Sequence, residues 1–159
     1  MSKERTAKPG AIQKRALIRA SAATVYRALT EAGELTEWFC DRAGADPRVG
    51  GLLTASWRCG RQIQCGCAVF RRLEPLRLLE LEWLDDAVDA HAQAEPHTLR
   101  YMIRTRKDGC ELIMNDDGCP LPDEDAMAAL EEGWISLLRA LKDHCEALER
   151  SLKSKRHPE

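Results

Sequence analysis

The C-terminal third of the chain carries a long apolar stripe, and this stripe limits the possible folds more than any other feature. Between Asp123 and Arg150, apolar residues recur at steps of three and four, the spacing of one face of an α-helix. About 28 residues at 1.5 Å each give a helix of roughly 42 Å. Such a helix is long enough to lie across a whole sheet. The stripe comprises Met127, Leu130, Trp134, Leu137, Leu138, Leu141, Cys145 and Leu148.

The preceding part of the chain predicts the sheet that this helix needs. In segments 77–84 and 97–106, apolar and charged side chains alternate, which is typical of an antiparallel sheet with one covered face. Asp108-Gly109 predicts a hairpin turn. Two short helices are expected at 21–30 and 34–39, and a loop at 42–51, where Pro47 and two glycines interrupt the pattern. The predicted strands are 13–20, 52–57, 62–73, 77–84, 97–106 and 110–116.

These elements predict an α+β fold in which the two short helices and the long helix cover the same side of one sheet. A curved antiparallel sheet of six to seven strands wraps around the long C-terminal helix, and two short helices follow the first strand. We expect a single domain over residues 12–150, a flexible tail over 1–11 and a polar tail over 151–159. A curved sheet that grips one helix leaves space between them, and that space is a candidate ligand cavity.

Composition restricts the partners and the location. The 159 residues carry a net charge of −2 with both signs mixed, which argues against nucleic acid because phosphate binding needs a basic surface. The N-terminus lacks the apolar core of a signal peptide, and no run is long enough to span a membrane. We therefore expect a cytoplasmic protein, and its seven cysteines should be reduced thiols rather than disulfides.

Three of the cysteines fall within the stretch CGRQIQCGC, residues 59–67. In a strand, Cys65 and Cys67 project to one face, about 6.6 Å apart at 3.3 Å per residue. This spacing suits neither an easy disulfide nor a zinc motif, which needs a second pair of ligands. We expect Ile63, Cys65, Cys67 and Val69 to form one apolar face of the core or cavity wall. A metal site and a redox centre stay open as less favoured alternatives.

Several segments, taken together, resemble the Aha1-type (activator of Hsp90 ATPase homologue) branch of the START-like, or SRPBCC, superfamily. They occur in the family's order and extend over roughly residues 13 to 150. The resemblance implies the helix-grip fold but no single function, because that fold hosts lipid carriers, receptors, cyclases and co-chaperone domains. The matching segments are SAATVYRALTEAGELTEWF, RVGGLLTASW, EPLRLLELEW and LPDEDAMAALEEGWISLLRALKDHCEAL.

The favoured function is non-enzymatic binding of a small apolar molecule in the cavity, with Tyr101 as the best polar contact. The alternatives are a protein-binding module, with a chaperone as the partner, and a cyclase or hydrolase. We expect no catalytic residue, no metal ligand and no cofactor. Gly133 within the long helix indicates either close packing on the sheet or room for a ligand. The predicted ligand-binding residues are Trp38, Phe39, Trp57, Val69, Leu81, Trp83, Tyr101, Ile103, Trp134 and Leu138.

Charged residues are expected to lie mainly outside the cavity. Alternation places Glu80, Glu82, Arg100, Arg104 and Glu111 on the outer sheet face, where opposite charges pair across strands. A homodimer in which two copies of this outer face pair is a further open alternative. The acid pairs at 85–86 and 116–117 lack the spacing of a calcium loop, so a cation site there is disfavoured.

Overall fold

The computed structural model describes residues 11–84, 97–118 and 123–156. Seven strands and three helices make up these segments. Residues 85–96, for which a loop is expected between the predicted strands 77–84 and 97–106, and the first ten residues of the expected N-terminal tail lie outside them. The elements, in chain order, are β1 (Ile12–Ile18), α1 (Ala22–Thr30), α2 (Ala32–Trp38), β2 (Arg42–Ala45), β3 (Leu52–Cys59), β4 (Gln62–Glu74), β5 (Leu78–Trp83), β6 (His97–Arg106), β7 (Gly109–Asp116) and α3 (Glu124–Arg156).

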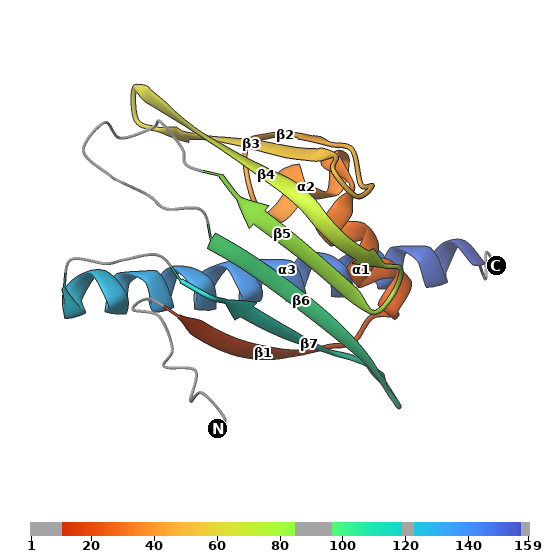
Figure 1. Cartoon of the computed structure of the whole chain (residues 1–159). Coiled ribbons are helices and arrows are strands. Elements are labelled where there is room, and N and C mark those ends of the chain that lie inside the picture. The colour runs from red at the N-terminus through yellow and green to blue at the C-terminus, as the bar shows by residue number, and fades with distance from the viewer. Residues whose placement is uncertain (1–10, 85–96, 119–122, 157–159) are drawn as a thin grey trace.

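The strands form one antiparallel sheet in the order β1-β7-β6-β5-β4-β3-β2. Strands β2 to β7 follow one another as a meander, and β1 pairs with β7 at the far edge, with Ile12 opposite Asp116. Figure 1 shows α3 running behind this sheet, with α1 and α2 on the same side. The predicted helix-grip architecture is therefore confirmed.

The apolar stripe of α3 is buried unequally along the helix. Leu141 and Cys145, in its second half, are fully buried against the core. In the first half, Leu130 is only half-buried and Ala129 is exposed. The helix therefore packs tightly at one end and less closely at the other. Its start is fixed by Asp123, the predicted N-cap, whose carboxylate accepts a hydrogen bond from the Ala126 N–H at 2.8 Å.

Acidic side chains of α3 hold its buried half to the start of α1. Glu149 accepts hydrogen bonds from the Ser21 N–H and the Thr24 hydroxyl, both at 2.8 Å. Glu146 accepts one from the Arg19 N–H at 2.9 Å. The Ser21 hydrogen bond lowers the pKa of Glu149, against the opposing effect of burial. The Ser21 contact satisfies the N–H of the N-cap residue of α1, which has no partner within the helix.

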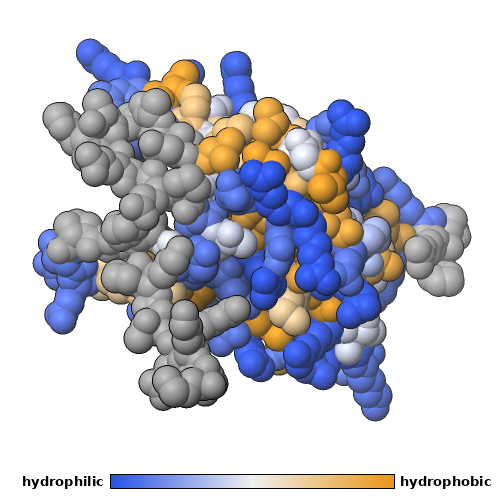
Figure 2. Space-filling view, viewed as in Figure 1, coloured by the Kyte–Doolittle hydropathy of each residue, from blue (hydrophilic) through white to orange (hydrophobic). Residues whose placement is uncertain are grey.

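The outer face of the sheet carries ion pairs across its central strands. Arg100 on β6 donates to Glu80 on β5 at 2.6 Å, which confirms the predicted cross-strand pairing of these two residues. Arg71 lies 3.2 Å from Glu82. Figure 2 shows hydrophilic residues over the middle of this face and hydrophobic ones towards the β3–β4 side.

The face assignment of β4 was wrong. The structure buries Ala68 and Phe70, whereas Ile63 is 64% exposed and Cys65 is exposed. Residues 67–70 are apolar without a break, so a period of two does not choose the buried face, and the large Phe70 ring decides it. Cys65 and Cys67 therefore line the outer face rather than the core. Val69 lies on that same outer face, opposite Leu52 and Glu82.

Two element boundaries also differ from the expectation. The predicted loop at 42–51 begins with the strand β2, which pairs with β3. Its four small or polar residues show no alternation by which a sequence could reveal it. Helix α3 continues to Arg156 rather than ending at Arg150, so 151–156 is helical. No described helix is long and apolar enough to cross a membrane.

Replacing Glu149 with glutamine should destabilise the fold by about 1–3 kcal/mol, because the negative charge that strengthens its two accepted hydrogen bonds is removed. The pKa of Glu149 is lowered in the folded state, so its contribution is present above the unfolded value and disappears as pH falls through the folded value. The difference in the free energy of unfolding between the variant and wild type should therefore be largest at neutral pH and should decrease in acid. Urea unfolding across this range measures it, with the exposed Glu37→Gln as control. Equal effects of both substitutions would contradict the account.

Candidate functional site

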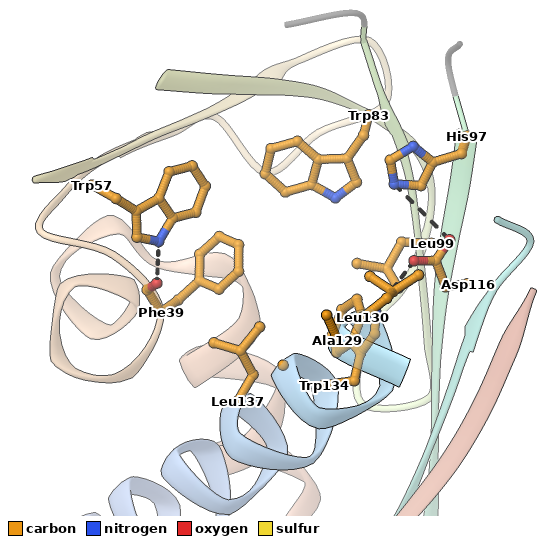
Figure 3. A pocket seen from close by; sticks show the side chains of 11 residues that line it. Phe39, Trp57, Trp83, His97, Leu99, Asp116, Ala129, Leu130, Trp134 and Leu137 are labelled. Atoms are coloured by element: carbon orange, nitrogen blue, oxygen red, sulfur yellow. Dashed lines mark hydrogen bonds and ion pairs between the residues drawn. The ribbon is translucent and has the colours of Figure 1, made fainter. Parts of the chain in front are cut away.

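A cavity of about 310 Å³ lies between the sheet and the first half of α3. It occurs where α3 packs less closely, so the same feature that leaves Leu130 half-buried creates the space. Figure 3 shows side chains surrounding it from Phe39, which directly follows α2, and from β3, β5, β6, β7 and α3. The lining residues are Phe39, Trp57, Trp83, His97, Leu99, Asp116, Ala129, Leu130, Gly133, Trp134 and Leu137.

Aromatic rings form one side of the cavity. The Phe39 ring lies 5.3 Å from that of Trp57, edge to face, and 6.0 Å from that of Trp83. The Trp57 indole N–H donates to the Phe39 carbonyl at 2.6 Å, which fixes the indole plane. Such offset and edge-to-face pairs are the favoured arrangements of aromatic rings. The wall is therefore rigid, apolar and rich in π-faces.

Polar groups gather on the opposite side, around Asp116 at the end of β7. Its side chain is 5% exposed, and its oxygens accept hydrogen bonds from the Gly118 N–H at 2.9 Å and the Trp134 indole N–H at 3.2 Å. The imidazole of His97 on β6 stands 3.9 Å away, beyond hydrogen-bond distance. In Figure 3 the carboxylate and the imidazole lie side by side at the cavity edge. Across the described ranges, no third metal-ligating side chain joins this pair.

The Trp83 indole adds a donor to the lining. Trp83 is 9% exposed, and Figure 3 shows its nitrogen directed into the cavity. Within the described part of the chain, this N–H has no hydrogen-bond acceptor. It is available to a ligand or to water.

A smaller void adjoins the cavity, because Phe39, Trp83 and Leu99 line both. Tyr101 lies there, only 3% exposed. Burial raises the pKa of its phenol well above the ordinary range, and the charge of Asp116 raises it further. Among the described residues its hydroxyl has no hydrogen-bond partner.

Gly133 opens the cavity rather than allowing close packing. A Cβ added at Gly133 would meet nothing within 4 Å, and the residue is exposed. Two explanations were possible for this glycine in the long helix, close packing on the sheet or room for a ligand. The open space beside Trp134 agrees with the second.

The structure brings some of the predicted ligand-binding residues together and separates others. Phe39, Trp57, Trp83 and Trp134 line the main cavity. Trp38, Leu81 and Tyr101 line the smaller void. Ile103 and Leu138 are core residues outside both linings, and Val69 faces the other side of the sheet.

His97 and Asp116 are the functional side chains that sequence reasoning missed. His97 and Asp116 fell at the ends of the predicted strands 97–106 and 110–116, and Asp116 was considered only as half of an acid pair that might bind a cation. The missing signal was strand phase: Asp116 continues the inward series Leu112, Met114, and His97 precedes Leu99 and Tyr101 on the same face. A charged residue in phase with a buried series is a candidate site residue.

The sequence profile of the family described as "Activator of Hsp90 ATPase homolog 1-like protein" matches residues 19–146. The chain belongs to this family. The match covers the first helix, the whole sheet except β1, and most of α3, so it includes every residue that lines the cavity. No curated protein matches the chain.

Solved structures similar to this family member share its fold at low identity. Protein CV1439 from Chromobacterium violaceum has a TM-score of 0.75 and 21% identity, over 87% of this chain and 99% of its own. MLL2253 from Mesorhizobium loti has a TM-score of 0.70 and 18% identity, over 86% and 97%. The Aha1 dimer from Colwellia psychrerythraea has a TM-score of 0.68 and 19% identity, over 86% and 96%.

The buried setting of Tyr101 predicts an ordered alkaline titration of the two tyrosines. Tyr26 is far less buried, although burial raises its pKa as well. We expect Tyr26 to ionise first and Tyr101 to ionise only at more alkaline pH or on unfolding. Ultraviolet absorbance of tyrosinate follows this, and Tyr101→Phe should leave the first step unchanged. Loss of the first step in Tyr101→Phe would show that the Tyr101 hydroxyl is in contact with solvent.

Proposed function

We propose that this cytoplasmic protein binds a small hydrophobic molecule non-enzymatically in the cavity between the sheet and α3. The observation that carries the proposal is the lining: three tryptophans, a phenylalanine and three leucines surround about 310 Å³. Ligand sites are typically concave, mainly apolar spaces of about 300–1,000 Å³ with a few polar groups. The exposed Gly133 at the rim gives a path for entry.

The size of the cavity limits what apolar contact can contribute. Burial of about 200 Å² of apolar ligand surface would contribute roughly 5 kcal/mol. Association costs at least about 4 kcal/mol. The difference is too small for tight binding, so useful affinity requires the polar groups of the lining. The ligand therefore carries an apolar body and a polar end.

A second candidate function, acid–base catalysis, is favoured by one observation. The imidazole of His97 stands 3.9 Å from the Asp116 carboxylate at the cavity edge, and a titratable pair inside a pocket is what proton transfer to a substrate needs. Turnover of an added cyclisable or hydrolysable compound that is lost in His97→Gln would support it. Binding without any change in the bound molecule would support the carrier instead.

Filling the cavity should abolish binding without loss of the fold. Leucine at position 133 would project into open space beside Trp134, and we expect Gly133→Leu to weaken binding of the neutral dye N-phenylnaphthylamine at least tenfold. Dye fluorescence on titration measures this. Gly33→Leu is the matched control, because Gly33 is also an exposed helical glycine whose Cβ would meet nothing within 4 Å. Equal dye affinity in both variants would overturn the proposal.

A further inference from the structure

The formal charge inside the cavity is negative and lacks a permanent counter-charge. Asp116 supplies the carboxylate, and none of the described lining residues is lysine or arginine. The hydrogen bonds that its oxygens accept from Gly118 and Trp134 come from uncharged N–H donors. A buried charge is costly unless it is paired. His97 at 3.9 Å is the neighbour that could become cationic.

The chain around the cavity has the same charge bias. Over residues 124–138, the half of α3 that lines the cavity, there are four acids and no basic residue; the first is Arg139. An anionic ligand would therefore meet repulsion near the cavity, and a cation would meet attraction.

The aromatic side of the cavity suits the apolar body of such a ligand. The rings of Trp57 and Phe39 lie across the space from the carboxylate, and Trp83 lies between them and His97 (Figure 3). These rings supply apolar contact for the body of a ligand. The carboxylate stabilises an alkylammonium group better than a neutral or anionic group of equal size.

We propose that the ligand is an organic cation: an amine with an apolar body, whose ammonium group pairs with Asp116 while its body lies against the aromatic wall. This inference rests on the proposed function, since it names the ligand class of the same cavity. The pairing of the ammonium group with Asp116 adds the polar interaction that is needed because apolar burial alone gives too little affinity. The Trp83 N–H remains able to donate to an oxygen elsewhere on the ligand.

Three probes of nearly equal size and different charge test the proposal at pH 8.0. They are 2-phenylethylamine (a cation), 2-phenylethanol (neutral) and phenylacetate (an anion), each measured as a competitor of N-phenylnaphthylamine. We expect the amine to bind at least tenfold more tightly than the alcohol, and phenylacetate to bind most weakly. Equal affinity of the amine and the alcohol, or tighter binding of phenylacetate, would overturn the proposal.

Two variants assign the preference to Asp116. Asp116→Asn keeps the shape and removes the charge, so the ratio of alcohol to amine dissociation constants should fall to about one, with the alcohol little changed. His97→Lys leaves the carboxylate in place but supplies a permanent cation beside it, and should reduce the ratio in the same way even if Asp116→Asn fails to fold. A ratio unchanged in a folded variant would overturn the assignment.

The same measurements separate failure of this inference from failure of the proposed function. If the dye and the alcohol bind and Gly133→Leu blocks both, the cavity is a binding site whatever the amine does. If neither the dye nor any probe binds wild type, the proposed function itself fails, and the inference with it.

Discussion

The structure depends on how α3 is held in place, because this one helix both completes the hydrophobic core and lines the cavity. Its second half is fixed by buried Leu141 and Cys145 and by Glu149, which accepts from Ser21 and Thr24 at the start of α1. Within the described part of the chain, its first half makes a single side-chain hydrogen bond to the sheet, from the Trp134 indole N–H to Asp116. The second half of α3 packs tightly against the core and holds the helix in place. The first half packs less closely against the sheet, and the cavity lies in the space that remains there.

The site follows from this asymmetry. Where the helix packs less closely, the inward faces of β3, β5, β6 and β7 lose their cover, and large aromatic rings replace it. Asp116 is unusual among the inward residues, because the same series upstream on β7 is Leu112 and Met114. A carboxylate at the end of an apolar series is costly unless paired, and real proteins tend to break such local rules at functional sites.

The sequence predicted the architecture better than the details of the site. The period of α3 and the alternation in β5 and β6 were strong, so the sheet, the helix and their relative positions could be predicted. Residues 67–70 carry no alternation, so the face of β4 could not be read from its pattern. The aromatic lining was found because tryptophans stand out, whereas Asp116 and His97 were missed because the inward phase of the predicted strands was not followed to their end residues.

The most direct test of the central claim is a heteronuclear NMR titration of the four tryptophan indole N–H signals with 2-phenylethanol. Trp57, Trp83 and Trp134 line the cavity, whereas the Trp38 N–H is bound to the Ala28 carbonyl at 2.9 Å and lines only the smaller void. The account predicts saturable shifts of those three signals and little change at Trp38. Shifts confined to outer-face residues such as Cys65 and Thr54, with all four indoles unchanged, would contradict it.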